Sequence, residues 1–308
     1  MISSISKCLR LLDPVFQALL VSLAVGECAA NDAFADVHIH FNWDQKEVID
    51  ARSIVEKLRA ADVSFAVVSG TPSELALELE HESSGFILPL FSPYTHELGR
   101  QDWYLSEQTL RLAEQGLRDG GYRGIGEIHF MIGFRPRLDN PIFLRLLALA
   151  EEHRVPVLIH IDAADESPFV ELCRARPDLR LLVAHAGGNL QARQVRRIVE
   201  QCANAMIDFS ARDPWRYGGL TGEDGRLLPA WRELVVDHPE RFMVGTDPVW
   251  KVTRTQSWDQ SDNGWDYFEQ LLTYHRRWID DLPGPVGQRV RLDNALRFFE
   301  IDARSFGN

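Results

Sequence analysis

The chain has 308 residues, of which 45% are hydrophobic and 25% charged, and its formal net charge is −12. Such a composition is typical of a globular protein with a sizeable core and excludes a long disordered or low-complexity chain. Lysine and arginine are scattered along an acidic chain, so a nucleic-acid surface, whose affinity comes mainly from phosphate neutralisation, is not expected.

The first thirty residues have the three-part layout of a secretory signal peptide. Lys7 and Arg10 precede an apolar run over 15–26, and the small residues 28–30 follow it. We predict cleavage near Ala30 and a periplasmic or secreted protein. The alternative is an uncleaved amphipathic helix on a cytoplasmic protein. The run is shorter than the roughly 20 residues that span a bilayer, so no stable membrane insertion is expected.

Strand-like and helix-like segments alternate from residue 34 onward. The predicted strands are 34–41, 63–69, 86–91, 122–128, 155–161, 179–184, 205–210 and 242–246, and the main helices are 50–61, 106–118, 141–153, 228–236, 265–280 and 288–300. Nearly continuous apolar strands that alternate with helices indicate an α/β fold with a parallel sheet. Eight units in a single domain, 31–308, predict a (β/α)8 TIM barrel. An open doubly wound sheet is the alternative, although the first strand lacks its glycine-rich phosphate turn.

Two cysteines, Cys173 and Cys202, lie beyond the predicted leader. They lack the C-x-x-C spacing of a redox motif or a thiolate metal site. An oxidising compartment would allow them to form a disulfide, but the sequence does not indicate whether their Cα atoms are close enough. Two buried thiols are therefore the default expectation.

Residues of the metal-ligand type stand at the ends of several predicted strands. The first strand carries His38 and His40, whose side chains share one face because alternate residues of a strand point the same way. The later strands end in Glu127, His160, His185 and Asp247. Carboxyl ends of barrel strands converge on one face, where barrel enzymes keep their chemistry. The six residues therefore predict a site for one or two divalent ions, with zinc the expected metal.

The order of these ligand residues along the chain resembles that of the amidohydrolase superfamily. The resemblance covers residues 36–300. The stretches 184–188 (A-H-A-G-G) and 294–299 (N-A-L-R-F-F) resemble the amidohydrolase-2 branch, whereas 124–127 (G-I-G-E) resembles the TatD-type nucleases. The resemblance implies that one ion is held by His38, His40 and Asp247, a second by His160 and His185, and that Glu127 bridges the two. The carboxylated lysine of many relatives is excluded, because no lysine lies on the fourth strand.

The expected function is metal-dependent hydrolysis of an amide, ester or lactone bond in a small substrate. A divalent ion activates a water molecule. Asp247 is the expected catalytic base, which accepts the proton of that water and passes it to the leaving group. The alternatives are a decarboxylase of the amidohydrolase-2 type and a non-catalytic metal- or solute-binding barrel protein. The predicted substrate-binding residues are Trp43, Arg135, Arg212 and Trp250, with Tyr94 and His129 among further candidates. Aromatic rings would form an apolar wall, and arginines would hold a carboxylate. The sequence does not indicate the oligomeric state.

Overall fold

Eight parallel strands form the centre of the computed structural model, which describes residues 33–95, 99–130, 136–161, 165–249 and 263–302. The strands are β1 (Phe34–Asn42), β2 (Val63–Thr71), β3 (Ile87–Leu90), β4 (Ile125–His129), β5 (Val157–His160), β6 (Leu181–Ala184), β7 (Ala205–Asp208) and β8 (Phe242–Met243). They pair in chain order as β1–β3 and β4–β8. The predicted signal segment, 1–30, lies outside the described residues.

Backbone hydrogen bonds close these two sheets into a ring. Between β3 and β4, Phe91 N donates to Gly124 O over 2.9 Å, and beside β8 Val37 N of β1 donates to Val244 O over 3.0 Å. The prediction of an α/β fold with parallel strands is thus confirmed, and the arrangement is that of a TIM-barrel-like fold.

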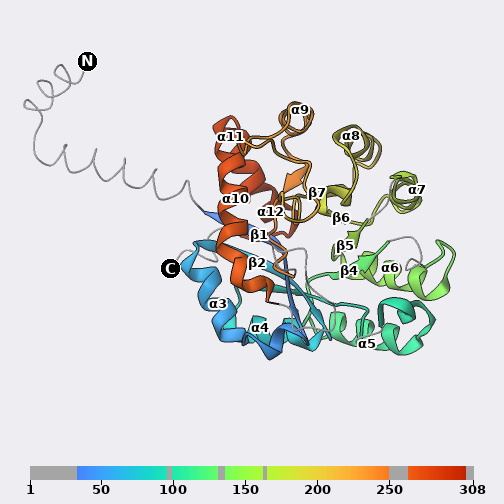
Figure 1. Ribbon diagram of the computed structural model, residues 1–308. Coiled ribbons are helices and arrows are strands. Elements are labelled where there is room, and N and C mark those ends of the chain that lie inside the picture. The colour runs from blue at the N-terminus through green and yellow to red at the C-terminus, as the bar shows by residue number, and fades with distance from the viewer. Residues whose placement is uncertain (1–32, 96–98, 131–135, 162–164, 250–262, 303–308) are drawn as a thin grey trace, which may run out of the picture.

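The helices are α3 (Ala51–Ala60), α4 (Glu74–Ser83), α5 (Glu107–Arg118), α6 (Pro141–His153), α7 (Ser167–Ala175), α8 (Ala192–Gln201), α9 (Pro229–Asp237), α10 (Phe268–Asp280), α11 (Gly284–Gln288) and α12 (Asn294–Phe298). Helices α3 to α10 surround the strands in chain order, as Figure 1 shows, and α12 lies close to β1. Asn140 caps α6 by accepting from Phe143 N over 2.9 Å, with Pro141 in the first turn, as the sequence predicts. Within the described ranges no helix is both long and apolar enough to cross a membrane.

Apolar side chains fill the barrel from its amino end. Inward-facing residues of the strands, such as Val37, Phe65 and Leu158, form one buried cluster with Ala295 of α12. Phe299, just after α12, packs against this cluster. A separate, larger cluster lies between the strands and the surrounding helices. The apolar filling leaves the carboxyl ends of the strands as the place where polar side chains gather.

The last strand is shorter than the predicted segment 242–246, because the chain leaves regular geometry as it meets β1. A Cβ atom on Gly245 would lie only 2.5 Å from the Cβ atom of His38, so this close approach requires glycine. Two residues later Asp247 has a φ of +47°, in the left-handed region. The final predicted helix, 288–300, is likewise divided by a π-helical turn, η7 (Arg289–Asp293), which precedes α12.

Cys173 and Cys202 form a disulfide, so the default expectation of two separate thiols is wrong. Cys173 lies in α7 and Cys202 directly follows α8, and their Cα atoms are 5.8 Å apart, within the range that disulfides span. Both residues are buried. The packing of neighbouring helices brings the two sulfur atoms together, although 29 positions separate them along the chain.

A buried histidine on α10 predicts a loss of stability in acid. His275 is fully buried, and its Nδ1 accepts from Trp278 Nε1 over 3.2 Å. Burial, with a further contribution from the positive charge of Arg216, lowers the pKa of His275 from its ordinary 6.5 to about 3. Between these two pKa values the unfolded chain binds a proton that the folded chain excludes. The free energy of unfolding therefore falls as the pH falls below 6.5.

We expect His275→Gln to reduce this acid sensitivity. From about pH 7 to about pH 5, the wild type should lose about 2 kcal/mol more of its free energy of unfolding than the variant does. Urea unfolding monitored by circular dichroism at both pH values measures this difference. His81→Gln, on the exposed side of α4, is the matched control. Equal losses in the wild type and in His275→Gln would contradict the prediction.

Candidate metal centre

The structure brings the six predicted ligands together at the carboxyl ends of the strands. They come from β1 (His38, His40), β4 (Glu127), β5 (His160) and the residues that follow β6 (His185) and β8 (Asp247). None of the six is more than 6% exposed. Among the described residues three sets of three possible donors lie within 4.8 Å of one another, and the third of these sets is His38, His185 and Asp208. The other two correspond to the two ions that the resemblance implies: His38, His40 and Asp247, and Glu127, His160 and His185.

Glu127 lies between the two sets and contacts all four histidines. Its Oε1 is 2.8 Å from His160 Nδ1, 3.2 Å from His185 Nε2 and 3.7 Å from His38 Nε2. Its Oε2 is 3.4 Å from His40 Nε2. A carboxylate in this place can donate one oxygen to each set, as a bridging ligand does.

The spacing of the histidine nitrogens fits a bound divalent ion. His38 Nε2 and His40 Nε2 are 3.1 Å apart, and His160 Nδ1 and His185 Nε2 are 3.2 Å apart. Two nitrogens that bind one tetrahedral zinc ion at 2.0–2.1 Å are about 3.3 Å apart. Each pair therefore has the separation that a shared ion requires, and nitrogen and carboxylate oxygen are donors that zinc accepts.

Asp247 is held at the centre by its own backbone. Its N–H donates to His38 O over 2.8 Å, and its Oδ1 is 3.5 Å from His40 Nε2. Buried Arg216 donates to the carbonyl oxygens of Asp247 and, over 2.7 Å, of Thr246. An ion pair of 2.6 Å with Asp213 compensates the charge of this guanidinium. These bonds maintain the left-handed backbone that directs Asp247 toward β1.

A second carboxylate fastens β1 to the same segment. Asp36 Oδ1 accepts from Thr246 N over 2.9 Å, and Oδ2 accepts from Thr246 Oγ1 over 2.6 Å. Burial raises the pKa of Asp36 to about 7, although the hydrogen bonds from Thr246 oppose that rise. Asp36, two residues before His38, is thereby hydrogen-bonded to Thr246, the residue before Asp247.

The carboxylates and imidazoles of the centre stabilise each other's charged forms. Burial alone would raise the pKa of Glu127, but His160 and His38 lower it well below its ordinary value. Burial likewise opposes ionisation of Asp247, and His38, His185 and His40 lower its pKa. Conversely, Glu127 and Asp208 outweigh burial and raise the pKa of His38 well above its ordinary value. Ionised carboxylates in so buried a place are suited to a bound cation.

Residues 106–301 match the family model named Amidohydro_2, described as amidohydrolase. The chain belongs to the amidohydrolase family. This membership confirms the predicted amidohydrolase-2 branch and a metal-dependent hydrolase as the class of enzyme. The matched range contains Glu127, His160, His185 and Asp247, whereas the H-x-H pair of β1 precedes it. The likeness of Glu127 to the TatD type stays a prediction.

Two solved structures of an amidohydrolase from Burkholderia multivorans are similar to this chain. The one with bound HEPES has 15% sequence identity and a TM-score of 0.57, and the one with bound zinc has 14% and 0.54. Each similarity covers 88% of this chain and 100% of the other. At these identities the likeness shows the fold alone. A search of curated proteins finds no match.

Four polar residues of the amidohydrolase's centre were not among the sequence predictions. Asp208 and Ser210 lie at and after the end of β7, Arg216 supports Asp247, and the Tyr217 hydroxyl is 3.3 Å from His160 Nε2. Asp208 and Ser210 could have been found, because both lie near the end of the predicted strand 205–210, as Glu127 and His160 do in their predicted strands. Arg216 and Tyr217 lie in the connection after β7, for which local sequence carries no comparable signal.

The predicted substrate-binding residues are only partly described. Trp43 follows β1 and is 39% exposed, so its ring is accessible to a small molecule. Arg212 is buried, donates to the carbonyl oxygens of Gly188 and Leu190, and lies 5.0 Å from the centroid of the Trp231 ring. These contacts give Arg212 a structural place in the amidohydrolase and do not support a substrate contact. The other two predicted residues, Arg135 and Trp250, lie outside the described residues.

The Tyr94 hydroxyl and His129, two further candidates, form a pair beside the ligands. The hydroxyl accepts from His129 N and forms a second hydrogen bond of 2.7 Å with His129 Nδ1. The His129 ring stacks on the His160 ring, with 4.6 Å between their centroids. Aromatic and polar groups thus continue from the ligand set along β4.

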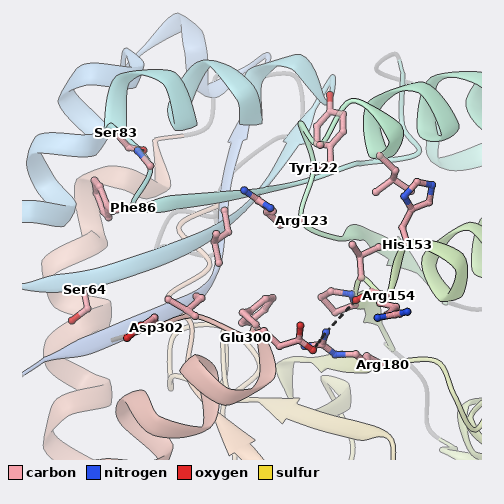
Figure 2. A pocket seen from close by; sticks show the side chains of 18 of the residues that line it. Ser64, Ser83, Phe86, Tyr122, Arg123, His153, Arg154, Arg180, Glu300 and Asp302 are labelled. Carbon is pink, nitrogen blue, oxygen red and sulfur yellow. Dashed lines mark hydrogen bonds and ion pairs between the residues drawn. The ribbon is translucent and has the colours of Figure 1, made fainter. Parts of the chain in front are cut away.

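A pocket of about 790 Å³ opens at the other end of the barrel, near the amino ends of the strands. Figure 2 shows its lining side chains, among them Arg123 and Arg154, together with the ion pair of 2.8 Å between Arg180 and Glu300. None of the six predicted ligands lines it. This pocket is therefore separate from the candidate metal centre.

Proposed function

We propose that this amidohydrolase hydrolyses an amide, ester or lactone bond of a small substrate at the centre around Glu127. The observation that carries the proposal is the position of Glu127 between two ligand sets whose nitrogens have the spacing of a shared ion. A bound divalent ion, with zinc the expected metal, would polarise the substrate carbonyl and lower the pKa of water to about 7. The six ligand residues would hold one ion or two.

Asp247 is the base that we propose for this reaction. Its carboxylate lies beside His40, and its lowered pKa keeps it ionised near neutrality. An ionised carboxylate at the edge of the centre can accept the proton of the attacking water and return it to the leaving group. Arg216 Nη1 lies 3.6 Å from Asp247 Oδ2, which favours the ionised form until the proton arrives.

The substrate would approach from the side of the centre that carries aromatic groups. Trp43 offers an accessible ring after β1, whereas Tyr94 and His129 are buried beside the ligands at β4. An accessible aromatic ring suits a small molecule with an unsaturated or aromatic part beside its carbonyl group.

Metal removal is the direct test. We expect purified protein to contain one or two equivalents of a divalent metal by elemental analysis. Chelation should abolish turnover over a panel of esters, lactones and amides, and readdition of zinc should restore it. Full activity in metal-free protein would overturn the proposal.

The same panel separates the proposed reaction from its alternatives. Release of carbon dioxide without a hydrolysed bond would show that the enzyme is a decarboxylase and not a hydrolase. Metal content without any turnover over the panel would favour a non-catalytic metal- or solute-binding barrel. Mass spectrometry of the products distinguishes these outcomes, because hydrolysis adds one water to the substrate and decarboxylation removes one carbon dioxide.

We also propose that the protein works outside the cytoplasm, in the periplasm or the medium. The disulfide between Cys173 and Cys202 supports this, because such bonds persist in oxidising compartments and are rare in the cytosol. The signal-like segment 1–30 supports it independently. Sequencing of the mature amino terminus after expression with the full leader tests the proposal, with cleavage near Ala30 expected.

A further inference from the structure

Two buried residues of β7 and its end lie behind the histidines, on the far side from Glu127. Asp208 and Ser210 are fully buried. Asp208 Oδ2 is 3.2 Å from His38 Nδ1, and Ser210 Oγ is 2.8 Å from His185 Nδ1 and 3.1 Å from His38 Nδ1. The Nε2 atoms of both rings face Glu127. In each ring Nδ1 therefore faces Asp208 and Ser210, and Nε2 faces Glu127 at the centre.

The hydrogen bonds within the pair determine which ring nitrogens carry protons. Asp208 Oδ1 accepts from Ser210 N over 2.8 Å, from His185 N over 3.2 Å and from the Ser210 hydroxyl. Because the hydroxyl proton is directed to Asp208, Ser210 Oγ can only accept from the rings of His38 and His185. Both rings must then carry a proton on Nδ1.

Two further acceptors agree with this assignment. The carbonyl oxygen of Ser210 lies 3.3 Å from His185 Nδ1, and a carbonyl oxygen can only accept. On the other ring, the ionised carboxylate of Asp208 can only accept from His38 Nδ1. With Nδ1 protonated, the neutral imidazole presents the lone pair of Nε2, which is the atom that binds a metal ion.

We propose that Asp208 and Ser210 are positioning residues that fix the Nδ1–H tautomer of His38 and His185 and so direct both Nε2 lone pairs to the metal centre. The inference rests on the proposed function and extends it. Of the two ligand sets that meet at Glu127, one contains His38 and the other His185, so the Ser210 hydroxyl forms hydrogen bonds to a histidine of each set. Partners of this kind set the orientation and basicity of metal-binding histidines.

Asp208→Asn is the principal test, because it preserves shape and replaces one acceptor oxygen by a donor. If Oδ1 keeps the backbone N–H groups of Ser210 and His185, the new amide nitrogen faces His38 Nδ1 and favours the wrong tautomer. We expect the zinc dissociation constant, measured by competition with a chromogenic chelator, to rise about 10- to 100-fold. Asp178→Asn, an exposed residue after α7, is the matched control and should bind zinc as the wild type does.

Ser210→Ala is the second variant and keeps the test valid if Asp208→Asn fails to fold. It removes the shared acceptor but leaves the Ser210 carbonyl for His185 and Asp208 for His38, so we expect a rise in the zinc dissociation constant of less than about 10-fold. Circular dichroism establishes folding for each variant.

Nuclear magnetic resonance of protein with ¹⁵N-labelled histidine observes the tautomer directly. Zinc-loaded wild type should show slowly exchanging Nδ1–H protons for His38 and His185, and Asp208→Asn should lose the His38 signal. A folded Asp208→Asn variant with wild-type zinc affinity, or the absence of an Nδ1–H signal from either ring in the zinc-loaded wild type, would overturn this inference alone. Failure of the wild type to bind zinc would instead overturn the proposed function, and the absence of an Nδ1–H signal from either ring of the metal-free protein would still overturn the proposed hydrogen bonds to Asp208 and Ser210.

Discussion

Replacement of Asp247 by Asn should reduce turnover by about 10²- to 10⁴-fold, the usual contribution of a general acid–base group. The amide keeps the shape of the carboxylate but cannot accept a proton from water. The backbone bonds that hold this residue, from Asp247 N to His38 O and from Arg216 to Asp247 O, involve no side-chain atom of residue 247. We therefore expect the fold to persist. The measurement is kcat on the first substrate that the panel identifies.

The control for this variant is Asp119→Asn, at the exposed end of α5, which should retain wild-type kcat. Elemental analysis of Asp247→Asn is needed beside the kinetics, because loss of an anionic ligand can also weaken metal binding. A low kcat in metal-loaded variant protein supports the assignment of Asp247 as the base. A metal-loaded variant with near wild-type kcat would refute it.

Reduction of the disulfide between Cys173 and Cys202 should lower the free energy of unfolding by about 3–4 kcal/mol. The bond closes a loop across a sequence separation of 29 and therefore limits the conformations of the unfolded chain. Urea unfolding with and without a reductant measures the change as a shift of the midpoint. The folded centre should stay intact, because the bond lies between α7 and α8, outside the ring of strands.

The double variant Cys173→Ala, Cys202→Ala provides the control for reduction. It should unfold near the midpoint of the reduced wild type, and the reductant should not change that midpoint. Peptide mapping without reduction should recover the two cysteines in one cross-linked fragment. Alkylation of both thiols in unreduced protein would contradict the bond and would remove one of the two supports for export.

Local sequence pattern was enough to predict the class of fold and the candidate ligands. Continuous apolar strands alternating with helices indicate parallel β/α units, because each pattern depends on residues that are neighbours in the chain. The convergence of His38, Glu127 and Asp247 also followed, since carboxyl ends of parallel strands meet at one face of a barrel. The predicted helix start at Asn140-Pro141 is likewise a local effect of capping.

Only the tertiary structure decided which of these groups contact one another and how. The disulfide, the support of Asp247 by Arg216 and the contact of Asp208 with His38 each join residues at least 29 positions apart. Such pairs are set by closure of the barrel and by packing of its helices, which no pattern of adjacent residues encodes. The sequence by itself therefore determined the fold class and the six candidate ligands, whereas their spacing, their protonation and the residues that orient them depend on contacts between distant segments.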